Sequence, residues 1–107
     1  FVEQVRRALG DGFSVGHSGV SGQTTESMIA NYATAVLTNY NASARRNILL
    51  FWEHTNSLLD YLVTHGILSA GADVSAAVAN TIAQAIIYCQ QAIADGWELV
   101  VPDIIAR

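Results

Sequence analysis

The stretch His65–Gly71, which reads HGILSAG, predicts a corner between two helices. Gly66 is expected to end the first helix, because glycine adopts the left-handed conformation of a C-terminal cap without strain. Ser69 or Asp73 can then cap the second helix by accepting a hydrogen bond from one of its free backbone N–H groups. We therefore expect the fold to be organised around this corner and the helix that follows it.

The helix after the corner is predicted to run to Asp95 and to end at Gly96. Its apolar residues recur at steps of three and four, which is the 3.6-residue period of an amphipathic helix. We expect this stripe to be the buried face and the helix to be central to the fold. The stripe consists of Val74, Val78, Ile82, Ala85, Ile86, Cys89 and Ile93.

Three further helices are predicted before the corner. The first spans residues 1–9 and is followed by a loop rich in glycine and serine at residues 10–22. The second helix is capped by Thr24 or Thr25 and closes at residues 39–41, where asparagine tolerates the turn. Its expected buried face consists of Ile29, Tyr32, Val36 and Tyr40.

The third helix is predicted over residues 42–64, where apolar side chains cover more than a third of the helix surface. The C-terminal tail is expected to lie across the helices, with Pro102 favouring extended geometry at Val101 and a short turn at residues 103–106. No segment shows the polar–apolar alternation of a convincing strand. The expected fold is all-α, a compact bundle of four to five helices. It forms a single helical domain over residues 1–107, as one unit of a longer chain.

The composition argues against nucleic-acid and membrane partners. Only 13% of the residues are charged, lysine is absent and the net charge is −4, whereas phosphate binding needs a concentrated positive field. No apolar run approaches the ~20 residues of a membrane-spanning helix, and no signal peptide is visible. Cys89 is the only cysteine, so it is either a small buried hydrophobe or half of an intermolecular bridge.

No group of residues predicts a catalytic, cofactor-binding or metal site. His54 and His65 lie roughly 16 Å apart if one helix carries both, which is too far for a shared metal ion. Glu53, His54 and Asp60 could act in acid–base chemistry, but polar residues on a helix surface explain them better. We therefore expect no enzyme, no cofactor and no small-molecule substrate.

The aromatic residues have two interpretations. They fall on helix stripes, which favours a place in the core, but they could instead line a pocket for a small apolar ligand. Trp97 lies outside the predicted helices and is expected to close one end of the bundle. The other residues in question are Tyr32, Tyr40, Phe51, Trp52 and Tyr61.

Residues 62–71, followed by the alanine-rich segment 74–86, resemble the folded repeat domains of spider silk proteins (spidroins) of the aciniform and minor ampullate kinds. In those domains a helix likewise ends in a glycine turn, and a helix rich in alanine and serine follows. The resemblance implies a structural, non-catalytic domain that is secreted, extracellular and soluble in storage. It also implies self-association with other copies of the chain and incorporation into a fibre or adhesive.

Two alternatives to the silk-type role stay open. One is a helical module for protein interaction or dimerisation, and the other is a carrier of a small apolar ligand. In the silk-type interpretation, Val74–Ile87 is uncharged and rich in β-branched residues. This segment could therefore convert from helix to paired strands under shear or drying.

Overall fold

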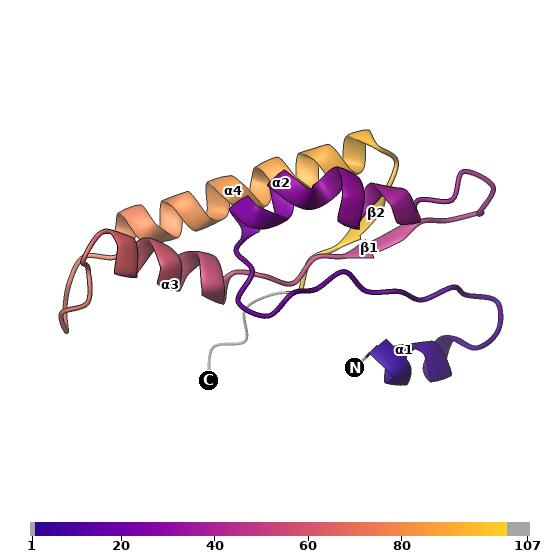
Figure 1. Cartoon of the computed structure of the whole chain (residues 1–107), viewed down its shortest axis with the longest axis horizontal. Helices are drawn as coiled ribbons and strands as arrows, with labels where there is room; N and C mark the ends of the chain where they lie inside the picture. The colour runs from indigo at the N-terminus through magenta and orange to yellow at the C-terminus, as the bar shows by residue number, and fades with distance from the viewer. Residues whose placement is uncertain (1, 103–107) are drawn as a thin grey trace.

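The computed structural model describes residues 2–102 of the chain (Figure 1). About 51% of the residues are helical, and two short parallel strands pair with each other. The expected all-α bundle is therefore wrong, and the fold is mixed α/β. The predicted turn at residues 103–106 lies outside the described residues. The elements are α1 (Val2–Leu9), α2 (Thr25–Ala35), the 3₁₀ helix η1 (Leu37–Asn39), β1 (Ile48–Leu50), α3 (Thr55–Thr64), α4 (Ser75–Ala94) and β2 (Glu98–Val100).

The fold is arranged along α4, the longest helix of the described part of the chain. Both α2 and α3 contact α4, and β2 returns against it after the chain turns at Gly96. In Figure 1, α3 lies beside the N-terminal half of α4 and α2 lies beside its C-terminal half. The prediction of a central helix after the corner is confirmed.

The corner at His65–Gly71 forms as its sequence predicts. Gly66 has a φ of +68° and donates its N–H to the carbonyl of Val63 at 3.1 Å. Ile67 donates its N–H to the carbonyl of Leu62 at 2.8 Å. These two bonds form a Schellman cap, which satisfies carbonyls that the end of α3 leaves without a partner inside the helix.

The starts of α2 and α4 are stabilised by residues that the sequence analysis named. Thr24 Oγ1 accepts the N–H of Ser27 at 3.3 Å, so Thr24 caps α2. The N-cap position of α4 is Val74, which makes no side-chain cap bond. Asp73, and not Ser69, supports the start of α4 from one residue earlier, since its Oδ1 accepts the N–H of Ser75 at 2.9 Å. Each bond satisfies a backbone donor in the first turn, where no intrahelical acceptor exists.

In the first part of the helix predicted over residues 42–64, the chain instead forms the strand β1. β1 pairs with β2 in parallel, in a register that puts Ile48 opposite Glu98 and Leu50 opposite Val100. The helix prediction is correct only for α3. A short apolar run such as residues 48–51 does not distinguish a strand from a buried helix, and its pairing partner lies 50 residues further along the chain.

The core is small and mainly aromatic. The ring of Tyr88 stacks on Phe51 with a centroid distance of 4.7 Å and meets the edge of Tyr32 at 5.6 Å. Trp97 meets Tyr40 edge-on at 5.4 Å. The core thus joins α2, the end of β1, α4 and the turn before β2. The buried residues of this cluster are Tyr32, Val36, Phe51, Tyr88, Ala92 and Trp97.

Gly96 ends α4 at a place where only glycine fits. Its φ is +94°, and a Cβ added to it would lie 2.7 Å from the hydroxyl oxygen of Tyr40. Gly66 also has a positive φ, but a Cβ there would meet no atom within 4 Å. A side chain at Gly66 would therefore cost only backbone strain, whereas a side chain at Gly96 would add a steric clash with Tyr40.

We expect Gly96→Ala to lower the free energy of unfolding by about 2 kcal/mol, and Gly66→Ala by about 1 kcal/mol. Both variants strain a left-handed residue, but only the first forces Tyr40 away from Trp97. Urea titration followed by tryptophan fluorescence measures both effects. Equal losses for the two variants would contradict the proposed clash with Tyr40.

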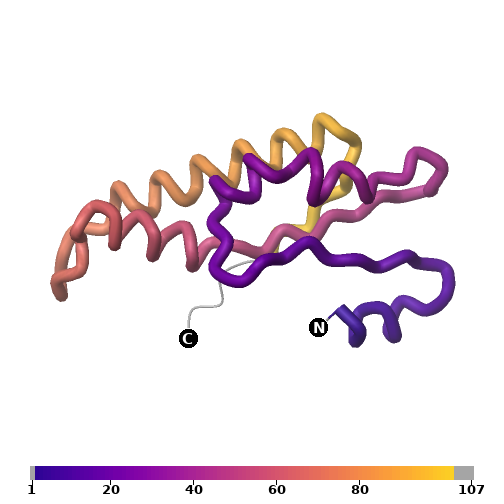
Figure 2. The backbone as a smooth tube through the Cα atoms, viewed as in Figure 1, coloured from indigo at the N-terminus to yellow at the C-terminus, as the bar shows by residue number. Residues whose placement is uncertain are grey.

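The molecule is elongated, so the predicted compact bundle is also wrong in shape. Its principal extents are 49 × 28 × 19 Å, and its radius of gyration is 15.8 Å. A compact domain of this length would have a radius of gyration of about 13 Å. Residues 2–22, which include α1, contain no buried residue. Figure 2 shows this N-terminal segment running along the outside of the other elements.

Candidate interaction surface

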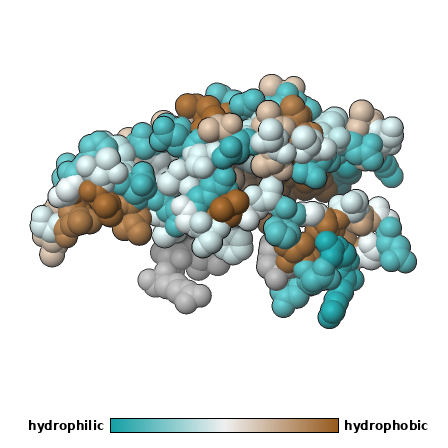
Figure 3. Space-filling model, in the orientation of Figure 1, coloured by the Kyte–Doolittle hydropathy of each residue, from teal (hydrophilic) through white to brown (hydrophobic). Residues whose placement is uncertain are grey.

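The apolar stripe predicted to be buried on α4 is largely exposed. Ile82, Ile86 and Ile93 are 54%, 50% and 60% exposed, and Val78 is 41% exposed. We call these four residues the α4 stripe. At ~100° per residue they lie within an arc of about 80° around the helix, so they form one continuous surface. Figure 3 shows separate apolar patches between hydrophilic residues along the upper edge of the molecule, where α4 runs in Figure 1.

The face of α4 that is buried consists mostly of small residues. Ala77 and Ala92 are fully buried and Thr81 is 7% exposed, while Tyr88 is the large side chain of this face. Small side chains let α2 and α3 approach the helix closely, and close fit decides burial more than hydrophobicity does. The recurrence of the small residues Ala77, Thr81 and Ala85 at steps of four was the available signal for this face.

The whole of α4 is uncharged, which sets it apart from an ordinary surface helix. From Ser75 to Ala94 the helix contains no Asp, Glu, Lys or Arg. Cys89 is a free thiol that lies half-buried beside the α4 stripe, and burial raises its pKa. An exposed helix normally carries charges on its outer face. The composition of α4 is therefore typical of a helix that is covered on more than one side.

The total exposed surface is also larger than a compact monomer needs. The chain exposes 7713 Å², whereas a compact monomer of its mass would expose about 5,800 Å². The outer face of the strand pair adds to the apolar part of this surface, since Ile48, Leu50 and Val100 are 44%, 41% and 50% exposed. Exposed apolar surface on this scale marks interaction sites in soluble proteins.

A polar cluster joins the N-terminal ends of α2 and α3. The Glu53 carboxylate accepts hydrogen bonds from the hydroxyls of Thr25 and Ser57 at 2.5 and 2.6 Å. It also accepts the backbone N–H groups of Asn56 and Ser57 at 2.8 and 3.2 Å. The N–H of Thr25 donates to Ser57 Oγ at 2.8 Å. Glu53 thus caps α3 and fixes the start of α2 to it.

The electrostatics of Glu53 follow from this cluster. Burial alone would raise the pKa of its carboxyl group, but the hydrogen bonds from Ser57, Thr25 and Asn56 outweigh that effect and hold the pKa below its ordinary value. The prediction that Glu53 is a helix-surface polar residue is wrong, because its hydrogen bonds connect two helices. A carboxylate held in its ionised form by four donor groups of its own chain suits a structural role and not proton transfer.

A polar cleft of about 330 Å³ lies next to this cluster, between α2, α3 and α4. The ring of His65 stacks on Tyr61 at a centroid distance of 3.9 Å, and its Nδ1 lies 2.9 Å from the Tyr61 carbonyl oxygen. Among residues 2–102, no three acidic, histidine or cysteine side chains are placed to hold a metal ion. The cleft is lined by Thr24, Glu26, Ser57, Asp60, Tyr61, Thr64, His65, Asn80 and Gln84.

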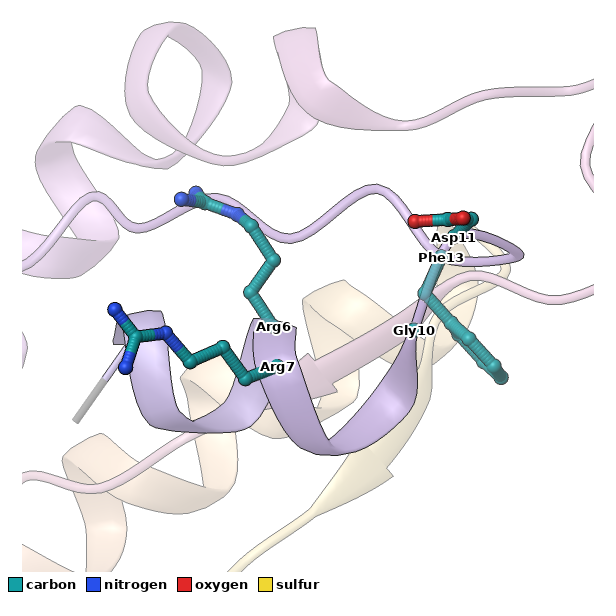
Figure 4. A pocket seen from close by; sticks show the side chains of 5 residues that line it. All are labelled: Arg6, Arg7, Gly10, Asp11 and Phe13. Carbon is teal, nitrogen blue, oxygen red and sulfur yellow. The ribbon is translucent and has the colours of Figure 1, made fainter.

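A second depression, of about 410 Å³, lies on α1 and the turn after it (Figure 4). Arg6 and Arg7 extend to one side, and Asp11 and Phe13 lie at the other, so these side chains do not converge on one point. Arg6 is already paired with Glu3. It also donates to the carbonyl of Val15 at 2.7 Å. This depression therefore lacks the convergent polar groups of a ligand site.

The aromatic residues divide between core and surface. Tyr32 and Phe51 are core residues, and Tyr40 packs against the core, as the first interpretation predicts. Trp97 is buried at the C-terminal end of α4, where it was expected to close the bundle. Tyr61 lines the polar cleft, while Trp52 is 63% exposed. These six rings therefore do not surround a common apolar cavity.

Two buried polar groups of the core make no hydrogen bond of standard geometry within the described residues. They are the hydroxyl of Tyr32 and the indole N–H of Trp97. Burial, together with the nearby carboxylate of Asp95, raises the pKa of Tyr32 to about 12. Tyr32 therefore stays protonated near neutral pH and contributes through the packing of its ring.

None of the helices in residues 2–102 combines the length and the apolar character that crossing a bilayer requires. Compared with protein-family models, curated proteins and solved structures, the chain matches none. The resemblance to spidroin repeat domains stays a prediction.

Proposed function

We propose that this chain is a non-catalytic interaction domain that associates with a second copy of itself through the α4 stripe. The observation that carries the proposal is the exposure of Val78, Ile82, Ile86 and Ile93 on an uncharged helix. Covering each buried methylene group of such side chains stabilises an interface by about 0.8 kcal/mol. Self-association is the partner class that the sequence analysis expected.

The area available supports a dimer of substantial size. The chain exposes about 1,900 Å² more than a compact monomer of its mass would. A standard interface removes about 800 Å² from each partner, and permanent dimers remove about 1,000–2,500 Å². Part of the excess belongs to residues 2–22, which have no buried residue. The exposed large side chains of α4 and of the strand pair are apolar, like the core of the interfaces that dimers bury.

The silk-type role is a proposal of the same class, because a fibre or adhesive also requires copies of the chain to associate. In addition, the silk-type role requires that the chain is secreted from the cell and stored in solution before it assembles. Its support is the resemblance of residues 62–71 and 74–86 to spidroin repeat domains. The α4 stripe supports self-association whether or not a fibre forms.

The mass of the purified chain in solution tests the proposal. Light scattering during size-exclusion chromatography should give twice the chain mass of 11.5 kDa. Ile82→Glu should give the monomer mass with unchanged circular dichroism, because it places a charge in the middle of the stripe. Ile87→Glu is the matched control, since Ile87 is 47% exposed on the same helix but lies outside the α4 stripe. A wild-type chain that stays at the monomer mass at millimolar concentration would refute the proposal.

A further inference from the structure

We infer that the two copies pack α4 against α4 in antiparallel orientation, about a two-fold axis that passes beside Ile86. The inference rests on the proposed self-association and specifies its geometry. It is carried by the spacing of the apolar residues along the exposed face of α4. The residues in question are the four of the α4 stripe together with the half-buried Cys89, in the order Val78, Ile82, Ile86, Cys89 and Ile93.

The spacing of these residues is nearly the same when it is read from either end of the helix. The steps are four, four, three and four from the N-terminal side, and four, three, four and four from the C-terminal side. A two-fold axis at the middle of the run therefore brings Val78 opposite Ile93 of the second copy. It also brings Ile82 opposite Cys89, and Ile86 beside its own symmetry mate. A surface that is complementary to itself in this way suits the isologous interface of a two-fold dimer.

The charges of the molecule favour a second copy as the occupant. The chain has a net charge of −4, so two copies repel each other wherever their acidic residues approach. α4 avoids this cost because Ser75–Ala94 is uncharged and the acidic residues that flank it in sequence, Asp73 and Asp95, lie beyond its two ends. The acidic residues Glu26 and Asp60 line the cleft beside Asn80 and Gln84, which are not part of the α4 stripe. Antiparallel packing also brings the positive end of each helix dipole to the negative end of the other, whereas parallel packing aligns like ends.

Small residues beside the α4 stripe allow the two helices to approach closely. Ala79 and Ala83 lie next to the stripe, on the side away from α2 and α3, and both are exposed. The distance between packed helix axes is about 8–10 Å and depends on the side chains at the contact, with small side chains allowing the shorter distances. The stripe spans about 22 Å along the helix at 1.5 Å per residue, which is long enough for about four turns to contact a partner.

The orientation determines whether Cys89 can form an intermolecular disulfide. In the antiparallel dimer the two Cys89 residues lie ~10 Å apart along the helix axes, because each is three to four residues from the symmetry axis. A disulfide requires a Cα–Cα distance below ~7 Å. In a parallel dimer the two Cys89 residues would face each other directly. The antiparallel geometry therefore keeps Cys89 as a free thiol and makes position 86 the place where a cross-link forms.

Disulfide trapping tests this geometry. We would oxidise three proteins with copper phenanthroline and separate them on a non-reducing gel: wild type, Cys89→Ala/Ile86→Cys, and Cys89→Ala/Ile87→Cys. The expected result is a covalent dimer for most of the Ile86→Cys variant, and less than about a tenth as much for the other two. The Ile87→Cys variant is the control, because it places an exposed thiol on the same helix outside the α4 stripe.

The outcomes separate the geometry from the proposed function. A dimer by light scattering in which wild-type Cys89 cross-links as readily as position 86 would mean parallel packing and would overturn the inference alone. A dimer with no preferential cross-link at either position would mean that another surface, such as the strand pair or α1, mediates it. A monomer by light scattering would refute the proposed function itself. Both cross-linked variants are first checked for wild-type circular dichroism.

Discussion

Replacing Tyr88 with alanine is expected to lower the free energy of unfolding by about 3–5 kcal/mol, the largest effect of any single truncation in this chain. Tyr88 is 2% exposed and lies between the rings of Phe51 and Tyr32. Its removal leaves a cavity that these rings cannot fill without moving the end of β1 or α2. Because the core cluster contains only six buried residues, little else compensates for the loss.

The measurement is urea unfolding followed by circular dichroism at one fixed protein concentration, so that dimerisation contributes equally to every variant. Ile87→Ala is the matched control, because Ile87 neighbours Tyr88 on α4 but is 47% exposed. It should shift the free energy of unfolding by less than about 1 kcal/mol. Similar losses for the two variants would show that the aromatic cluster is not the core of the domain.

Replacing Glu53 with alanine is expected to lower the free energy of unfolding by about 2–4 kcal/mol. The variant removes the acceptor of four hydrogen bonds and leaves the hydroxyls of Thr25 and Ser57 without it. It also removes the cap of α3. Glu26→Ala is the control, since Glu26 is an exposed carboxylate in the first turn of α2. Urea midpoints that coincide for the two variants would contradict a linking role for Glu53.

The same carboxylate gives the domain a pH dependence whose sign is fixed. Hydrogen bonds to its carboxylate make the pKa of Glu53 lower in the folded chain than its ordinary value, so the folded state favours the ionised form. The resulting stabilisation is fully present above the unfolded pKa and is lost as the pH falls through the folded pKa. Glu53→Gln should therefore show a smaller loss of stability than wild type between pH 5 and pH 2. An unchanged pH profile in this variant would exclude Glu53 as a source of the acid sensitivity.

The turns and caps of this fold could be predicted from the sequence because they depend on a few neighbouring residues. Gly66 and Gly96 end their helices through their own backbone conformation. Thr24 and Asp73 need only a free N–H two or three residues later. Such features require no knowledge of what packs against the helix. The central helix between Asp73 and Gly96 could be delimited for the same reason.

The pairing of β1 with β2 could not be predicted, because it depends on a contact between residues 50 positions apart. The run at residues 48–51 has the hydrophobicity of a helix core and of a strand alike. Only its neighbour in space decides between them. Glu53 was misjudged as a result, because a helix drawn through residues 42–64 places it in the middle of a helix. With the correct start of α3, its spacing of three from Asn56 is that of an N-terminal cap.

The orientation of α4 was also beyond the sequence, since its two candidate faces adjoin each other on the helix. One carries large apolar residues such as Ile82 and Ile86, and the other carries small ones such as Ala77 and Ala92. Hydrophobicity alone selects the first face for the core. In the folded chain the face with the small residues is the buried one, because α2 and α3 fit closely against small residues. The first face is then left for a partner.

The parallel pairing of β1 with β2 has a consequence for synthesis of the chain. Parallel strands can pair only after the connection between them has been made, and closing a loop of this length is slow. While the ribosome adds α3 and α4, Phe51 and Leu49 have no strand beside them and Trp97 has not yet been incorporated. The aromatic core is therefore complete only when Val100 has emerged from the exit tunnel. The domain is therefore expected to complete its folding only after β2 has been synthesised.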